Sequence, residues 1–575
     1  MSSNYQQLKS NAIEKWDNLL SSKPWVRVGG GVSGQAAGAE DIFDEIKNSD
    51  LVDQLDFNVS LVGSLGLMYL EPIVDITTPD GLRIFYSNVS SESILQIIEK
   101  HLNSDTPVFD KSAFAYTGDS PAVKNIKLPE LYSLDIMKLQ KRLVTKNFGN
   151  IDPSDIDQYI ANGGYEALDK AVNLSTPEEI VNQVKNSGLR GRGGAAFPTG
   201  VKWSFLAPAQ SDSKYVLCNC EEGDPGAFND KGILESDPNT LIEGLIINGY
   251  ATNSTKGYVF IRHGHEHPIN ATKSAISQAY ERGLLGKNIL GSEFSFDMEV
   301  ALTGDSYVAG EETALMEAIE GKRSTPRFKP PFPAAAGLWQ KPTNINNVKT
   351  LSYVPSIISN GSDWFKKVGT ESTSGTALVC LSGHIKRPGL YEVEMGMTIN
   401  DVIYKIGGGG LNNQKIKVLQ AGGPLNGLLG EPAFETRIDF DEMTKAGASI
   451  GSGGIIVGND KTDIVDLLRN LIAFNQFESC GKCFPCRLGN THMLEILDRM
   501  CEKKAEPKDL QLIKKIGNSM KVGSLCGHGQ LGYNPISSAM RYFKKDIDDC
   551  LDGNYELTGP YKDGKMLRPT RTRPD

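Results

Sequence analysis

A stretch dense in glycine, Gly188–Trp203, constrains this chain more than any other part of its sequence. It reads G-L-R-G-R-G-G-A-A-F-P-T-G-V-K-W. Glycine inside a helix or strand costs roughly 0.5–1 kcal/mol relative to alanine, so this run predicts a loop. A glycine loop lets the backbone approach a ligand closely and offer its N–H groups to phosphate. On its own, the run is also compatible with a plain surface loop.

Charged and aromatic residues within this loop favour a nucleotide ligand. Arg190, Arg192 and Lys202 add positive charge beside the amides, and Phe197 and Trp203 supply flat apolar surfaces. Together they suit a nucleotide, because its phosphate can meet the positive charges and its ring can stack on the aromatic surfaces.

Composition sets the class of protein. A chain of 575 residues predicts three to five domains, and 39% hydrophobic with 23% charged residues is typical of a globular protein. No apolar run is long enough for a membrane span, and the first residues lack the apolar core of a signal peptide. The net charge of −10 argues against nucleic-acid binding. We therefore expect a cytoplasmic protein.

The pattern of strands and helices predicts a multidomain α/β chain. We expect a small α/β domain at 1–110, a connector at 111–180, a ligand-binding α/β domain at 181–350, a β-grasp module at 351–445, a helical domain at 446–550 and a basic tail at 551–575. Within the connector, Leu134–Lys146 is expected to be a helix. The chemistry of the β-grasp module is uncertain, and we favour a spacer that braces its neighbours.

Polar residues follow two of the expected strands in the third segment. The strand Tyr215–Leu217 runs into C-N-C-E-E-G-D-P-G-A-F, and the strand Phe296–Thr303 is soon followed by Y-V-A-G-E-E-T-A-L. Ligands of α/β proteins bind at the carboxyl ends of such strands. The proline-rich stretch Arg323–Pro342, which ends in P-T-N-I-N-N-V, is expected to be a rigid loop that could wrap a cofactor.

The nine cysteines are clustered, and none precedes Cys218. Cys480, Cys483 and Cys486 form a Cys-x-x-Cys-x-x-Cys turn, and Cys526 in S-L-C-G-H-G is the best candidate for a fourth ligand. Four thiolates fit a [4Fe–4S] cluster or structural zinc. Three close ligands and one distant ligand favour the cluster, because zinc sites usually use two separated pairs.

The chain resembles a known family over roughly residues 134–543. The matching motifs are G-R-G-G-A-A-F-P-T-G-V-K-W, N-C-E-E-G-D-P-G-A-F, Y-V-A-G-E-E-T-A-L, P-T-N-I-N-N-V, E-S-C-G-K-C-F-P-C-R-L-G and S-L-C-G-H-G-Q-L. It is similar to the NADH-binding flavoprotein subunit of respiratory complex I. Soluble relatives are the diaphorase subunits of NAD-linked hydrogenases, formate dehydrogenases and electron-bifurcating complexes.

The resemblance implies a Rossmann-like FMN and NADH domain, a β-grasp (SLBB-like) module and a four-helix bundle that holds one [4Fe–4S] cluster. It implies cofactor contacts at Gly191, Arg192, Gly193, Gly194, Phe197, Lys202, Phe205, Asn219, Glu221, Glu222, Asp224, Tyr307, Gly310, Glu311, Glu312, Asn346 and Asn347. Within this set, Phe197 and Phe205 would stack on the nicotinamide nucleotide, and Glu222 and Asp224 would lie near it. No side chain is expected to act as a catalytic nucleophile.

The chain departs from the family pattern at several positions. Soluble relatives often carry an N-terminal thioredoxin-like domain with a [2Fe–2S] cluster, and residues 1–110 look like that domain without its ligands. The four ligand positions fall on Gly29, Gly34, Ser64 and Met68, none of which is a thiolate. Asp305 stands where the family usually has glycine, and its negative charge could weaken nucleotide binding.

The leading hypothesis is an enzyme subunit that transfers hydride between NADH and FMN and passes single electrons through the cluster to partner subunits, which we expect to be iron–sulfur proteins. The alternative is an electron-transfer or scaffold subunit without NADH turnover. Electron bifurcation, the preference for NADH or NADPH, and the terminal acceptor stay open.

Overall fold

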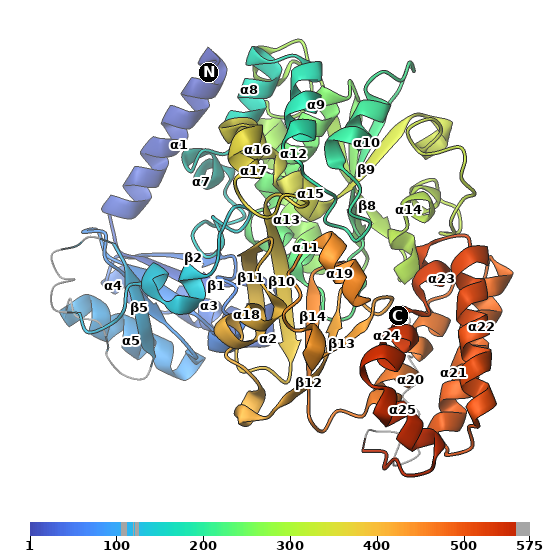
Figure 1. Cartoon of the computed structure of the whole chain (residues 1–575). Coiled ribbons are helices and arrows are strands. Elements are labelled where there is room, and N and C mark those ends of the chain that lie inside the picture. The colour runs from blue at the N-terminus through green and yellow to red at the C-terminus, as the bar shows by residue number, and fades with distance from the viewer. Residues whose placement is uncertain (105–107, 109–111, 119, 121–125, 559–575) are drawn as a thin grey trace.

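The computed structural model describes residues 1–104, 108, 112–118, 120 and 126–558 (Figure 1). The predicted basic tail therefore lies largely outside the described residues. Three sheets and a C-terminal group of helices make up the described chain, and five clusters of buried hydrophobic side chains hold them together.

The central sheet is parallel throughout, in the order β8-β7-β6-β9. Its strands are β6 (Tyr215–Cys220), β7 (Lys256–Arg262), β8 (Asp297–Thr303) and β9 (Thr343–Asn347). The sheet is surrounded by helices α7 (Ile156–Ala161), α8 (Glu166–Leu174), α9 (Pro177–Asn186), α10 (Thr199–Leu206), α11 (Asn229–Ser236), α12 (Pro238–Ala251), α13 (Glu266–Glu281), α14 (Glu312–Ile319), α15 (Val348–Ser352), α16 (Val354–Asn360) and α17 (Ser362–Lys366).

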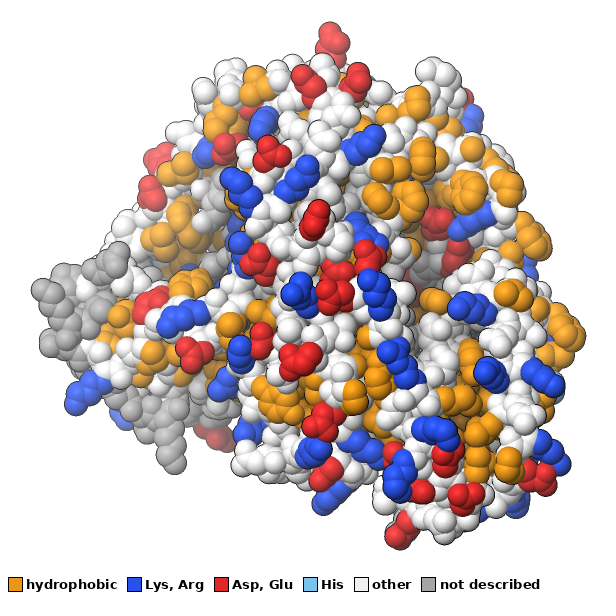
Figure 2. Space-filling view, in the orientation of Figure 1, with side chains coloured by type: hydrophobic (Ala, Val, Ile, Leu, Met, Phe, Trp, Pro, Cys, Tyr) orange, Lys and Arg blue, Asp and Glu red, His pale blue; other side chains and the backbone are white. Residues whose placement is uncertain are grey.

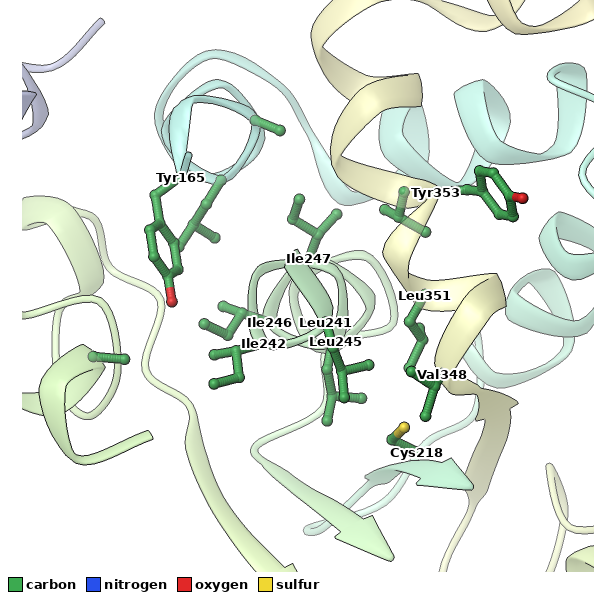
Figure 3. Close-up of a cluster of buried hydrophobic side chains, with 14 of the residues drawn as sticks. Tyr165, Cys218, Leu241, Ile242, Leu245, Ile246, Ile247, Val348, Leu351 and Tyr353 are labelled. Carbon is green, nitrogen blue, oxygen red and sulfur yellow. The ribbon is translucent and has the colours of Figure 1, made fainter. Parts of the chain in front are cut away.

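Helix α12 lies at the centre of the largest core. Its side chains Ile242, Leu245 and Ile246 are fully buried, and Figure 3 shows them between Tyr165 on one side and Leu351 on the other. Burial of each such side chain stabilises the folded state by about 1.5–3 kcal/mol. Because α12 is buried on nearly all sides, it anchors the sheet to the surrounding helices.

The N-terminal sheet has the order β2-β1-β3-β4-β5. Strands β1 (Trp25–Gly29) and β2 (Asn58–Val62) are parallel, and the pairs with β3 (Val74–Thr77), β4 (Arg83–Tyr86) and β5 (Ala113–Thr117) are antiparallel. Helices α2 (Gly31–Ala36), α3 (Ala39–Lys47), α4 (Leu51–Gln54) and α5 (Ser91–Ser104) accompany it. Strand β5 shows that this sheet continues past residue 110.

The first helix, α1 (Ser3–Ser21), meets that sheet through the Trp16–Trp25 ring contact and packs chiefly on the central domain. It lies against α7, and Tyr5 donates a hydrogen bond to the carbonyl of Gly164 at 2.9 Å. Tyr5 and Ala12 are part of the core around α12. The N-terminus is therefore fixed to the central domain.

The third sheet has the order β11-β10-β14-β12-β13. Its strands are β10 (Thr376–Gly383), β11 (Gly389–Glu394), β12 (Ile416–Ala421), β13 (Leu428–Gly430) and β14 (Gly454–Asn459), with α18 (Ile399–Asp401) and α19 (Phe440–Ala446) beside them. Its core includes Leu67 and Phe85 of the N-terminal segment, so the module packs against the first domain.

The C-terminal region is helical, as the sequence predicts. Its helices are α20 (Ile464–Phe477), α21 (Phe484–Cys501), α22 (Pro507–Gly523), α23 (Gly527–Leu531), α24 (Asn534–Tyr542) and α25 (Lys544–Leu551). They share a core of aliphatic side chains and methionines. None of the helices in the described ranges is long and apolar enough to cross a membrane.

Two sequence predictions of local structure were wrong. Only α6 (Asp135–Lys138) forms within Leu134–Lys146, because the distant carboxylate of Glu392 accepts the backbone N–H groups of Leu143, Val144 and Thr145. The stretch Pro342–Val348 is not a loop: Thr343–Asn347 pairs with β6 as strand β9.

Candidate functional site

The glycine-rich loop joins α9 to α10 and folds back on itself. The N–H of Gly191 donates to the carbonyl of Phe197 at 2.8 Å. A Cβ on Gly193 would lie 2.9 Å from Cβ of Asn347, and Gly194 has a φ of +120°, which L side chains rarely adopt. The loop therefore needs glycine at these two positions for different reasons, one steric and one conformational.

The guanidinium of Arg192 faces the protein interior. It donates to the carbonyls of Ser374 at 2.6 Å and Thr376 at 3.3 Å, and its side chain is buried. The donors of this side chain are therefore taken by β10 and the residues just before it, and a contact between Arg192 and a phosphate stays a prediction. A ligand at this loop would meet the backbone around Arg192 rather than its guanidinium.

Two aromatic rings stand at the outer side of the loop. Phe197 and Phe205 are 46% and 56% exposed, and their ring centroids lie 6.4 Å apart. Exposed rings at this separation offer an apolar surface on which a planar ring can stack. Trp203, in contrast, is fully buried and belongs to the core.

Asparagines line the carboxyl edge of the central sheet. Asn219 at the end of β6 donates to the carbonyl of Gly310 at 2.8 Å. Asn347 donates to Asp230 at 2.6 Å, and Asn346 donates to Asn344 at 2.7 Å. The sheet thus brings segments that are distant in sequence to one edge.

Glu221 is a buried carboxylate that is paired with Arg262. The two side chains meet at 2.9 Å, and Arg262 also bonds to Asp305. Desolvation raises the pKa of Glu221 well above its usual value, and the charge of Arg262 opposes this rise. Asp305, whose charge the sequence marks as a hazard for nucleotide binding, is thus neutralised by a neighbour.

Glu222 and Asp224 lie on the turn that follows β6. Glu222 accepts the N–H groups of Asp230 and Lys231, both at 2.8 Å. Asp224 accepts the hydroxyl of Tyr307 at 2.5 Å. Desolvation raises the pKa of Asp224, and its hydrogen bonds to Ser452 and Tyr307 lower it in part.

A cluster of two lysines and two glutamates stands at the start of α14. Lys202 meets Glu312 at 3.2 Å, and Lys329 meets Glu311 at 3.0 Å and Glu312 at 2.6 Å. Desolvation alone would raise the pKa of Glu312, but the two lysines hold it below its usual value. Lys329 is not among the residues predicted from the sequence, although the basic, proline-rich stretch around it is a signal.

A loop of the β-grasp module completes this side of the site. The carbonyl of Ser452 accepts the side chains of Asn229 at 2.6 Å and Lys349 at 3.1 Å. The loop before β14 of the third sheet therefore contacts the central domain at α11 and α15. No spacing in the sequence predicts this contact.

The four cysteines of the C-terminal region line one pocket, together with Ser479 and His528. Cys480, Cys483 and Cys526 are partly exposed, Cys486 is buried, and all four are free thiols. No group of three or more His, Cys, Asp or Glu side chains in the described ranges is close enough to hold a single metal ion. Four thiols are a donor set that suits an iron–sulfur cluster.

The pocket also contains polar groups that suit a sulfur-rich cluster. Ser479 and Asn490 lie 3.3 and 3.4 Å from the Cys486 sulfur. Ser524 Oγ and His528 Nδ1 are buried without a hydrogen-bond partner in the described chain. Since hydrogen bonds to sulfur tune such clusters, these donors fit a bound cluster.

Tyr307 joins the two sites. Its backbone N–H donates to Glu478 at 3.0 Å, and its ring centroid lies 5.3 Å from Phe474 and 5.7 Å from His528. Its hydroxyl bonds to Asp224 at the sheet edge. The glycine-loop site and the cysteine pocket are therefore neighbours, which defines a protein of the flavin and iron–sulfur electron-transfer class.

Comparison with known proteins identifies the family. Residues 184–356 match the model of the Nuo51 FMN-binding domain, 378–428 match the SLBB domain, and 466–550 match the iron–sulfur binding region of NADH-ubiquinone oxidoreductase F. The chain is 44% identical over 415 residues to the NADP-reducing hydrogenase subunit HndC of Solidesulfovibrio fructosivorans, and the match covers 72% of this chain and 84% of that protein. It is 38% identical over 398 residues to NADH-quinone oxidoreductase F of Escherichia coli strain K12, with 69% and 89% covered.

The chain belongs to the family of NADH-quinone oxidoreductase F subunits and their hydrogenase relatives. This confirms the predicted oxidoreductase class, the FMN and [4Fe–4S] cofactors and the SLBB module. The crystal structure of an NAD+-reducing [NiFe]-hydrogenase in the H2-reduced state has a similar fold, with a TM-score of 0.64 at 23% identity over 95% of this chain and 90% of that chain.

Proposed function

We propose that this protein is the NADH-oxidising flavoprotein subunit of a multi-subunit redox complex. The observation that carries the proposal is the position of Tyr307, which touches Asp224 at the sheet edge and His528 at the cysteine pocket. FMN, when bound, exchanges hydride with a nicotinamide and exchanges single electrons with an iron–sulfur cluster. The presence of both sites in one chain supports a subunit in which one site exchanges hydride and the other exchanges single electrons.

The glycine loop and the sheet edge supply the groups that would hold FMN. The backbone N–H groups around Gly193 suit its phosphate, and the side-chain amides of Asn219, Asn346 and Asn347 suit the polar edges of its ring and ribityl chain. Lys202 adds a positive charge. The remaining predicted contacts, Gly310, Glu311 and Glu312, lie at the start of α14.

The exposed pair Phe197 and Phe205 would stack on the nicotinamide nucleotide. Their position beside the glycine loop supports a geometry in which the two reacting rings are held face to face. Glu222 and Asp224 would border the nicotinamide. The chain's own residues thus bind and orient, and none needs to form a covalent bond.

Electrons would leave through the cysteine pocket to an iron–sulfur partner subunit. Phe484 and Val522, near this pocket, are 65% and 86% exposed, and Lys482 and Arg487 are also exposed. Figure 2 shows hydrophobic and basic side chains side by side over α22, at the right of the view. An apolar surface with a cationic rim suits an acidic partner.

We further propose that the N-terminal segment is a thioredoxin-like docking module that has lost its cluster. The order β2-β1-β3-β4, with only the first pair parallel, supports this classification. The free thiols support a cytoplasmic location, since disulfides are rare there.

The test uses the full chain purified without oxygen. We expect bound FMN and one four-iron cluster per chain, and bleaching of the flavin absorbance on addition of NADH. Cys526→Ser should remove the iron, whereas Cys501→Ser, a buried cysteine of the same helical region, should retain it. Flavin that NADH does not bleach would refute NADH oxidation, and full iron in Cys526→Ser would refute the ligand set.

A further inference from the structure

The four cysteines of the pocket are not equivalent. Cys486 is buried, and its sulfur has two polar side chains within hydrogen-bonding distance: the hydroxyl of Ser479 at 3.3 Å and the amide nitrogen of Asn490 at 3.4 Å. In the described ranges, Cys480 and Cys483 receive no such side-chain hydrogen bond. A thiolate can only accept, so both neighbours would donate to it in the metal-bound state.

Asn490 lies one helical turn after Cys486 on α21, and its side chain is fully buried. Its amide nitrogen also donates to the carbonyl of Cys486 at 3.1 Å, so its two N–H groups can serve the carbonyl and the sulfur. Its Oδ1 atom has no partner in the described chain. A buried unpaired amide oxygen is destabilising, so packing alone does not explain an asparagine here.

The surrounding backbone is shaped to admit this side chain. A Cβ on Gly532 would lie 3.2 Å from Asn490 Oδ1, and a Cβ on Gly529 would lie 2.8 Å from Cβ of Cys486. Glycine at both positions lets α23 and its C-terminal end pack closely against the amide and the sulfur. The amide is thereby held on the side of the pocket that is remote from solvent.

We infer that Asn490 and Ser479 are positioning residues that raise the reduction potential of the cluster. The inference rests on the proposed function, in which the four cysteines bind a [4Fe–4S] cluster. Reduction adds one electron and therefore one negative charge, part of which falls on the sulfurs. N–H and O–H donors aimed at a sulfur stabilise the more negative state, and burial strengthens them.

The consequence is a bias in the direction of electron flow. A cluster with a higher potential takes an electron more readily from a reduced flavin. Cys486 has the two side-chain donors, whereas backbone N–H groups of His528 and Gly529 face Cys526.

The experiment measures the midpoint potential of the cluster by a redox titration followed by electron paramagnetic resonance, on the full FMN-containing chain. Asn490→Leu keeps the side-chain size and removes the donor. We expect the equilibrium for reduction to fall about tenfold, which for a one-electron couple is about 59 mV. Asn470→Leu is the matched control, because Asn470 lies on α20 and donates to Asp466 at 3.3 Å.

Ser479→Ala is a second variant in case Asn490→Leu fails to retain the cluster, and it should lower the potential in the same direction. Variants with full iron and an unchanged potential overturn the inference and leave the proposed function intact. Absence of any cluster signal from the unaltered chain overturns the proposed function instead. A fall in potential in Asn490→Leu that Asn470→Leu does not share supports the inference.

Discussion

Substitution of Gly193 by alanine tests the glycine-loop site most directly. The new Cβ would lie 2.9 Å from Cβ of Asn347 and 3.4 Å from its Cγ. Asn347 cannot retreat easily, because its side chain donates to Asp230 at 2.6 Å and accepts from the N–H of Lys349 at 3.0 Å. The loop itself must therefore move outward.

Overpacking of this kind destabilises the native conformation by about 1–3 kcal/mol. If the displaced loop is the FMN phosphate cradle, this cost appears as weaker binding, by about five- to a hundred-fold in Kd. Titration of the deflavinated chain with FMN, followed by fluorescence quenching, measures the change. Gly304→Ala is the control, because a Cβ there meets nothing within 4 Å and Gly304 has no positive φ. A Kd for Gly193→Ala within twofold of the unaltered chain would refute the assignment of the cradle.

Two further predictions concern buried carboxyl groups. Arg262→Gln removes the cation that meets Glu221 at 2.9 Å, so the pKa of Glu221, already raised by desolvation, should rise further. The pH profile of flavin bleaching by NADH should then move to higher pH, and an unchanged profile would contradict this role. Desolvation raises the pKa of Asp237 to about 7, above its value in an unfolded chain. Because the folded state then holds the proton more tightly, the contribution of this group to the free energy of unfolding is fully present below about pH 4. That contribution is lost as the pH rises to about 7. As the pH rises from about 4 to about 7, the melting temperature of Asp237→Asn should therefore increase relative to that of the unaltered chain. Parallel curves of melting temperature against pH would show that Asp237 does not titrate in this interval.

Local spacing made part of the site legible in the sequence. The turn with Cys480, Cys483 and Cys486 and the glycine loop each carry their chemistry within a few residues, and both led to cofactors that the family comparison confirms. The individual cofactor contacts stay predictions, as do the domain boundaries. Long-range partners were not legible: neither the Arg262–Asp305 pair nor the contact of Ser452 with Asn229 leaves a mark in sequence spacing.

The errors in secondary structure have similar causes. Strand β9 was read as a loop because its asparagines lack the apolar character of a buried strand. The helix expected over Leu134–Lys146 does not form in full, because Glu392 accepts its backbone N–H groups. Helix α12 shows no apolar stripe of period 3.6 in its sequence, because it is buried nearly all round and includes buried polar residues such as Glu243 and Asn248.

The contact between Ser452 and Asn229 has a consequence for biosynthesis. The sheet edge is complete once Asn347 has been made, but the loop that closes it belongs to the much later third sheet. At a synthesis rate of about 5–20 residues per second, several seconds pass between the synthesis of Asn347 and that of the loop that contains Ser452. Flavin should therefore be captured durably only after the β-grasp module has emerged, and chains released before that point should be made without it.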